Sequence, residues 1–354
     1  MGLARHDLPP PIAATIARGT VIPAHPLALG RDRKLDERRQ RALSRYYIDA
    51  GSGGLAVGVH TTQFAIREHG LYARVLALAA EEAQQWSPRP LLMIAGAIGD
   101  TRQAVGEAAV ARDLGYHAVL LGLAQLAHAS DDELIAHCRS VAREMPLVGF
   151  YLQTAVGGRV LSARFWERFA AIDNVVAIKI APFNRYRTLD VVRGVVAARA
   201  EDRIALYTGN DDHIVLDLLT RYDLPRDGER VRPGIVGGLL GHWSVWTRSA
   251  CALFARIAAA REKERVDAGW LALDARITDC NAAFFDVAHD FAGCIAGCHE
   301  VLRRQGLLAG IECLDPHEAL SPGQAAEIER VWRAYPELND DDFVAANLAR
   351  WLET

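Results

Sequence analysis

The segment PLVGFYLQTAVGGRVLSARFWERFAAIDNVVAIKIA (residues 146–181) carries the clearest signal of the fold. Its two apolar runs, Leu147–Tyr151 and Val175–Ile178, flank an amphipathic segment, Ser162–Ala171, that begins with a serine suited to cap a helix. An apolar run, a helix and a second apolar run are typical of a βαβ unit, whose two strands are parallel. This stretch therefore predicts two neighbouring parallel strands joined by a helix.

The same alternation recurs along the first two-thirds of the chain. Eight apolar runs are predicted to be strands: Thr20–Ala24, Gly54–Val59, Leu91–Ala95, Ala118–Leu121, Leu147–Tyr151, Val175–Ile178, Ile204–Tyr207 and Gly234–Gly237. Eight strands, each followed by a helical segment, predict an α/β fold of the (β/α)8 TIM-barrel type with a C-terminal helical extension. A doubly wound sheet is the competing fold, but the segment AHPLALGRDRK after the first strand lacks the glycine-rich phosphate turn that this fold requires.

Changes in pattern along the chain predict its domain organisation. We expect an N-terminal arm at residues 1–18, the barrel at residues 19–260 and a C-terminal helical region at residues 261–354. A polar insert, residues 221–234, precedes the eighth strand and is predicted to be a surface loop.

Composition narrows the class of protein. The 354 residues are 51% hydrophobic and 24% charged, with a formal net charge of -4 and no basic block, so nucleic acid is not an expected partner. No run approaches the ~20 apolar residues that cross a bilayer, so no membrane association is expected and the predicted location is the cytoplasm. The six cysteines are too few for a disulfide scaffold and are expected to be reduced thiols.

Active sites of barrel enzymes lie at the carboxyl ends of the strands, where Lys179 ends an otherwise apolar run. Burial disfavours the ammonium form of a lysine and leaves a free amine that attacks a carbonyl to form a Schiff base. Tyr151 ends the preceding strand and is expected beside Lys179 as a proton-transfer group. The alternative is that Lys179 pairs with a carboxylate or reaches solvent and that Tyr151 is only packed at the rim.

Polar groups also follow the second and seventh strands. His60, Thr61 and Thr62 come directly after the second strand, and the two hydroxyls with the backbone donors of the turn suit a carboxylate. Gly209 follows the seventh strand in the segment LYTGNDD.

At these residues the chain resembles the dihydrodipicolinate synthase and N-acetylneuraminate lyase family of Schiff-base aldolases and lyases. VVAIKIA is similar to the strand that carries the family's Schiff-base lysine, and the 28 residues from Tyr151 to Lys179 fit its tyrosine-to-lysine spacing. GLAVGVHTTQF is similar to its double-threonine loop, LYTGNDD to the end of its seventh strand, and GIVGG, which contains Val236, to its last strand.

The resemblance implies a role for each matching residue. Lys179 would form an imine with a 2-keto acid such as pyruvate or a keto sugar acid, and Tyr151 and Thr62 would assist catalysis. The substrate would contact a set of residues that follow the strands: His60, Thr61, Thr62, Gly209 and Val236. The family further implies a homo-oligomer, a dimer or a tetramer, with no cofactor and no metal.

The chain departs from the family pattern in two places. GLAQLAH stands where many members carry a tyrosine that crosses a dimer interface, and Val156 stands where the synthases carry an arginine for the second substrate's carboxylate. These departures favour a lyase of the aldolase or dehydratase type over the lysine-biosynthetic synthase itself.

Two alternatives remain open at this point. His25, His60 and His242 follow the first, second and eighth strands and are candidate ligands of a metal-dependent barrel hydrolase, with Asp211 or Asp212 as ligand or base. The missing tyrosine also allows a non-catalytic homologue that binds a keto acid.

Overall fold

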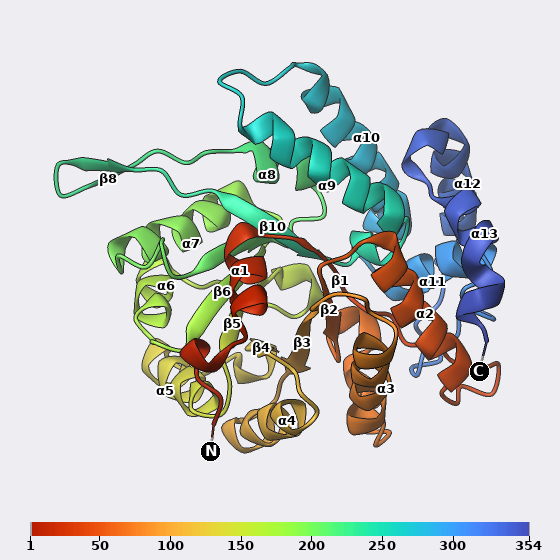
Figure 1. The fold of residues 1–354 in the computed structure, drawn as a ribbon, viewed down its shortest axis with the longest axis horizontal. Helices are drawn as coiled ribbons and strands as arrows, with labels where there is room; N and C mark the ends of the chain where they lie inside the picture. Colours follow the sequence, from red (N-terminus) through yellow and green to blue (C-terminus); the bar gives the residue numbers. More distant parts are fainter. Residues whose placement is uncertain (1, 354) are drawn as a thin grey trace. The chain divides into compact units, whose positions relative to one another are not determined.

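The structure is a computed structural model that describes residues 2–353. Eight parallel strands form one sheet in the order β1-β10-β7-β6-β5-β4-β3-β2, and the predicted (β/α)8 barrel with extra C-terminal helices is confirmed. The chain divides into two compact units (Figure 1). One comprises the residues up to Thr20 with Leu92–Leu239, and the other comprises Val21–Leu91 with the residues from Leu240 onward.

The first unit holds most of the barrel strands. Its elements are α1 (Pro10–Arg18), β3 (Leu92–Ala97), α4 (Thr101–Asp113), β4 (Ala118–Leu121), α5 (Asp131–Ala142), β5 (Leu147–Leu152), α6 (Ala163–Ala170), β6 (Val175–Ala181), α7 (Arg185–Ala197), β7 (Ala205–Thr208), α8 (Ile214–Leu219), β8 (Leu224–Arg226), β9 (Glu229–Val231) and β10 (Ile235–Leu240, whose last residue belongs to the second unit). Six of the eight predicted strands are found here, each within a few residues of its predicted bounds.

The second unit joins the first two strands to the C-terminal helices. Its elements are β1 (Val21–Pro23), α2 (Glu37–Ala50), β2 (Gly54–Val57), α3 (Tyr72–Gln85), α9 (Thr247–Arg261), α10 (Gly269–Phe284), α11 (Cys294–Arg304), α12 (Gln324–Ala334) and α13 (Asp341–Trp351), with short 3-10 helices that include η2 (His60–Thr62). A parallel bridge between Ala24 and Ala56 joins the ends of β1 and β2.

This division differs from the predicted boundaries at residues 18 and 260, because side chains of α2 are bonded to the C-terminal region. The Tyr46 hydroxyl donates to the buried Asp340 carboxylate at 2.7 Å, and Arg45 donates to the carbonyl oxygen of Trp351 at 3.0 Å. The C-terminal helices are therefore part of one folded body with β1 and α2 and not a separate appendage.

Several helix ends follow the signals in the sequence. The Asp36 carboxylate accepts from the Arg39 amide at 3.0 Å and caps α2, and the Ser162 hydroxyl accepts from the Phe165 amide at 3.1 Å and caps α6. Gly51 ends α2 with a φ of 102°, a left-handed conformation that a glycine adopts without strain.

The insert at residues 221–234 is an ordered β-hairpin, whereas the sequence analysis predicted a surface loop. Figure 1 shows the β8–β9 hairpin projecting outward, and Arg226 of β8 donates to the carbonyl oxygen of Val196 in α7 at 3.1 Å. Arg226 and Glu229 are paired across a two-residue turn, Asp227-Gly228, whose φ values are 50° and 83°. Asp-Gly with both φ values positive is a turn that suits a tight hairpin, and this signal was missed in a segment read only for its polarity.

Helices α6 and α7 pack so closely that glycine is required at position 194. A Cβ atom there would lie 2.5 Å from the Trp166 Cβ and 2.7 Å from the Ala163 carbonyl oxygen. Gly106, in the middle of α4, has no atom within 4 Å of the corresponding position. Replacing each of these two helical glycines by alanine therefore distinguishes the effect of close packing from that of intrinsic helix propensity.

We expect Gly194→Ala to destabilise the protein by about 1–3 kcal/mol because backbone atoms must move apart. Gly106→Ala, the matched control, should instead stabilise it by roughly 0.5–1 kcal/mol, the helix propensity difference. Urea unfolding followed by circular dichroism measures both midpoints. Equal shifts in the same direction would contradict the packing described for α6 and α7.

Candidate functional site

Lys179 is the central residue of the candidate site. It is the fifth residue of β6 and only 7% of it is exposed, because β6 is buried along its whole length. In the parallel register Lys179 is paired with Phe150 of β5 and with Tyr207 of β7. Its Nζ atom lies 4.5 Å from the centre of the Phe150 ring, which is the geometry of a cation–π contact. The amine thus lies over an aromatic ring on a buried strand.

Gly209 lies directly against the Lys179 side chain, so the structure brings these two predicted residues together. A Cβ atom at position 209 would be 2.6 Å from the Lys179 Cε and 2.8 Å from the Ala181 Cβ. The Gly209 amide also donates to the Ile180 carbonyl oxygen at 2.7 Å. The chain after β7 can therefore pass the lysine only because residue 209 has no side chain.

Tyr151 does not share a face of the sheet with Lys179. It is paired with Ile180, and successive residues of a strand point to opposite faces. The Tyr151 ring packs 5.3 Å from the Trp166 ring of α6, and its hydroxyl donates to the Leu161 carbonyl oxygen at 3.2 Å and accepts from the Leu161 amide at 3.1 Å. The sequence analysis placed Tyr151 beside Lys179, but the inward-facing residue at this level of β5 is Phe150.

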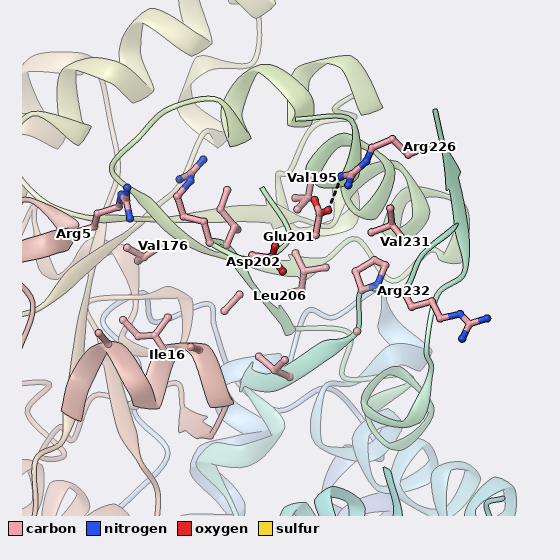
Figure 2. Close-up of a pocket in the computed structure, with 18 of the residues that line it drawn as sticks. Arg5, Ile16, Val176, Val195, Glu201, Asp202, Leu206, Arg226, Val231 and Arg232 are labelled. Carbon is pink, nitrogen blue, oxygen red and sulfur yellow. Dashed lines mark hydrogen bonds and ion pairs between the residues drawn. The ribbon is translucent and has the colours of Figure 1, made fainter. Parts of the chain in front are cut away.

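Val236 also lies away from Lys179. It lines a cavity of about 600 Å³ at the amino ends of β6, β7 and β10. Figure 2 shows this cavity with its lining residues Ile16, Glu201 and Leu206. Gly209 lies at the other, carboxyl end of β7. The pairing of β10 with β7 shifts between Ile235 and Gly237, which leaves Val236 as the extra residue of an irregularity. The structure therefore does not bring Val236 together with Lys179 and Gly209.

Thr61 and Thr62 form the short helix η2 in the second unit, and both are buried. The Thr61 hydroxyl donates to the Ala24 carbonyl oxygen at 2.7 Å, and the Thr62 hydroxyl donates to the His25 carbonyl oxygen at 2.6 Å. The Thr62 Oγ1 also accepts from the Gly58 amide at 3.0 Å. Both hydroxyls thus fix the turn to the end of β1, and the Thr62 amide is itself bonded to the Val59 carbonyl oxygen at 3.0 Å. His60, the first residue of η2, is partly exposed and its ring contacts the Phe64 ring edge-on.

His25 and His242, two of the histidines considered as metal ligands, are both buried. Both ring nitrogens of His25 are already bonded, Nδ1 to the Pro26 carbonyl oxygen at 2.8 Å and Nε2 to the Ser44 hydroxyl at 2.9 Å. Burial lowers the pKa of His25 and of His242 to about 4, so both imidazoles are neutral at physiological pH. Among residues 2–353 no three His, Cys, Asp or Glu side chains are placed to hold a metal ion. His25 therefore has no free nitrogen for the hydrolase alternative.

A buried polar group in the first unit was not predicted from the sequence. Thr208, Asn210 and Asp217 are joined by hydrogen bonds at the end of β7 and the start of α8, and all three are buried. Asp217 belongs to a short helix whose apolar pattern, IVLDLL, contains one carboxylate. A lone acidic residue inside an apolar pattern was the signal that could have identified it.

No helix within the described part of the chain has both the length and the apolar composition needed to span a bilayer.

Comparisons with known proteins agree with the fold. The model of the dihydrodipicolinate synthetase family matches residues 18–221. A search of curated protein sequences returned no match. Among solved structures, CdNal from Clostridium difficile in complex with mannosamine is 15% identical with a TM-score of 0.72, and the alignment covers 90% of this chain and 99% of that one.

Two dihydrodipicolinate synthases are also similar. The enzyme from Oceanobacillus iheyensis is 17% identical over 92% of this chain and 99% of that chain, with a TM-score of 0.71. The enzyme from Acinetobacter baumannii complexed with pyruvate is 19% identical over 91% and 99%, with a TM-score of 0.70. At these identities the likeness of the structures extends to the fold alone. The family model, however, covers more than half of the sequence, and the chain belongs to the dihydrodipicolinate synthetase family, as its sequence resemblance predicted.

Proposed function

We propose that the protein is a lyase that forms a Schiff base between Lys179 and a 2-keto acid. The observation that carries this proposal is the position of Lys179, which is buried on β6 against the Phe150 ring and Gly209. Family membership supports the same assignment. We also propose, from the family resemblance, that the protein is a cytoplasmic homo-oligomer.

The lysine content of the chain supports a chemical role for Lys179. The sequence has 40 basic residues, of which only Lys34, Lys179 and Lys263 are lysines, so the other 37 (40 minus 3) are arginines. Lys34 and Lys263 are exposed. A guanidinium stays protonated and is not a nucleophile, whereas an amine forms an imine. Lys179, the lysine that is buried, therefore stands where the proposed chemistry needs an amine.

In the proposed reaction the Lys179 amine loses its proton and attacks the keto carbon of the substrate. The resulting carbinolamine loses water to give a protonated imine, which draws electrons from the neighbouring bond. In cleavage, the proton of the C4 hydroxyl is lost and the C3–C4 bond breaks, which releases an aldehyde and leaves an enamine that is protonated at C3 and hydrolysed to the keto acid and the free amine. In dehydration, loss of a C3 proton gives an enamine that expels the C4 hydroxyl as water, and hydrolysis of the resulting conjugated imine releases the unsaturated keto acid and the free amine. From the family resemblance we assign the substrate carboxylate to the turn that contains Thr61 and Thr62.

The substrate class follows from the same residues. A 2-keto acid supplies both the carbonyl that Lys179 needs and the carboxylate that the turn would hold. The related structures were solved with mannosamine and with pyruvate, and both kinds of ligand are consistent with cleavage of a keto sugar acid to pyruvate. We propose His60 as a hydrogen-bonding partner for the hydroxyl groups of such a substrate.

Lys179→Ala should abolish covalent trapping by borohydride in the presence of pyruvate. Intact mass spectrometry should find one reduced pyruvate on each wild-type chain and none on the variant. The matched control is the double variant Lys34→Ala/Lys263→Ala, which should be trapped as the wild type is. An adduct that persists in Lys179→Ala, or that disappears in the double variant, would contradict the assignment.

Tyr151→Phe should act on stability rather than on the reaction, because the hydroxyl bonds to the backbone of Leu161 on the face opposite Lys179. Removing it leaves two buried backbone groups without that partner, which costs about 1–3 kcal/mol. We expect a lower urea midpoint and trapping with pyruvate at the wild-type level. A fall of about 10²-fold or more in the trapping rate of fully folded protein would instead return Tyr151 to the proton-transfer role that the sequence suggested.

The condensation of pyruvate with aspartate semialdehyde should be slow in this protein. Val156 stands where the synthases carry an arginine, and the loss of a bidentate contact to a carboxylate costs about 10²-fold in rate. Val156→Arg should recover part of that loss in a coupled assay. Val160→Arg, at a nearby position that is 53% exposed, is the control. Rapid turnover by the wild type would identify the protein as a synthase.

A further inference from the structure

The buried polar group at the end of β7 includes the residues on both sides of Gly209. The Asp217 carboxylate, of which 2% is exposed, accepts from the Thr208 hydroxyl at 2.7 Å and from the Asn210 side-chain amide at 2.8 Å. Thr208 and Asn210 are the residues immediately before and after Gly209. The Asp217 carboxylate therefore fixes both neighbours of Gly209, the residue that lies against Lys179.

The same group also reaches the segment that follows Lys179 in the chain. The Asn210 side-chain oxygen accepts from the Phe183 amide at 3.0 Å, and Arg185, the first residue of α7, donates to Asp217 at 2.6 Å. Phe183 has a φ of 50°, a conformation that a bulky residue adopts only when its surroundings hold it there. The loop after β6 and the loop after β7 are thus tied to one buried carboxylate.

These contacts form a chain that ends at the amine. Gly209 packs against the Lys179 Cε, where an added methyl group would have to occupy a position 2.6 Å away. A displacement of residues 208–210 would therefore either press on the lysine side chain or open a gap beside it. Protein interiors are close-packed, so a side chain that loses a neighbouring packing surface can adopt additional rotamers.

We infer that Asp217 is a positioning residue for Lys179, which through Thr208 and Asn210 fixes Gly209 and so sets the direction from which the amine meets the keto carbon. This inference rests on the proposed function, because it assigns Asp217 a role in imine formation. Asp217 itself touches neither the substrate nor the reacting atoms. Its contribution is to orientation, and errors in orientation of about 1 Å cost up to about 10²-fold in rate.

The test measures imine formation directly. Each cycle of imine formation and hydrolysis replaces the keto oxygen of pyruvate by oxygen from water, so the exchange of pyruvate in H₂¹⁸O above the uncatalysed exchange through its hydrate, followed by mass spectrometry, reports the step. At saturating pyruvate we expect Asp217→Asn to lower the exchange rate by about 10- to 10²-fold. The midpoint of urea unfolding gives the folded fraction by which each rate is corrected.

Two further variants separate positioning from general stability. Asp340 is a buried carboxylate of the second unit that accepts from the Tyr46 hydroxyl, and Asp340→Asn should lower the urea midpoint without changing the exchange rate. In the double variant Asp217→Asn/Asn210→Asp the carboxylate and the amide exchange places, the acceptor for the Phe183 amide is kept, and much of the exchange rate should return. Thr208→Val, a change of similar shape, serves if Asp217→Asn does not fold, and should lower the rate by at least several-fold.

The outcomes distinguish the inference from the proposed function. If the wild type shows neither oxygen exchange nor borohydride trapping, the Schiff-base function itself is overturned. If the wild type exchanges oxygen while Asp217→Asn and Thr208→Val exchange at the same rate, only the inference is overturned. Asp217 would likewise have only a structural role if Asp340→Asn lowered the exchange rate as much as Asp217→Asn does. The same conclusion would follow if the double variant did not restore the exchange rate.

Discussion

The register between β5 and β6 is the constraint on which the surroundings of Lys179 depend. It pairs Lys179 with Phe150 and Ile180 with Tyr151, so the ring of Phe150 faces the amine while the ring of Tyr151 faces α6. A slip of one residue would reverse every side chain of β5. It would bring a phenol to the lysine and would separate the Tyr151 hydroxyl from the backbone of Leu161. The chemistry available at Lys179 is therefore decided by strand pairing as much as by residue identity.

The hydroxyl groups near the ends of the barrel strands mostly bond to the protein itself. Thr61 and Thr62 hold the turn after β2 against the end of β1, and Thr208 holds the loop after β7 against α8. Each hydroxyl thus contributes to the rigidity of a loop instead of offering a contact to a ligand. Rigid loops hold their backbone groups in place before a ligand arrives, so little reorganisation is needed when it binds.

Much of the fold was predictable because each element carries its own local signal. The eight apolar runs, the caps at Asp36 and Ser162 and the position of Lys179 are all evident along the chain. The direction in which Tyr151 points was not predictable, because the pairing of β5 with β6 shifts between Leu147 and Val148, and a shift in register leaves no mark in the sequence.

The other differences between the predicted and the observed positions also arise from long-range pairing in the folded chain. The irregularity that sets Val236 apart lies in the pairing of β10 with β7, and the group around Asp217 joins residues on two loops and a helix that only the folded chain brings together. The β8–β9 hairpin is the exception, because the turn signal at Asp227-Gly228 was present in the sequence. Long-range pairing, rather than local preference, thus accounts for most of what the sequence did not reveal.

The scarcity of lysine has a practical consequence for handling the protein. Reagents that acylate or cross-link side-chain amines meet two accessible targets, Lys34, whose side chain is 84% exposed, and Lys263, while Lys179 is shielded by Phe150 and the chain at Gly209. Coupling to a surface or a dye through primary amines therefore attaches the molecule at few, known points and spares the buried amine. The many arginines on the surface are inert to such reagents, and they keep the protein charged after both accessible lysines have been modified.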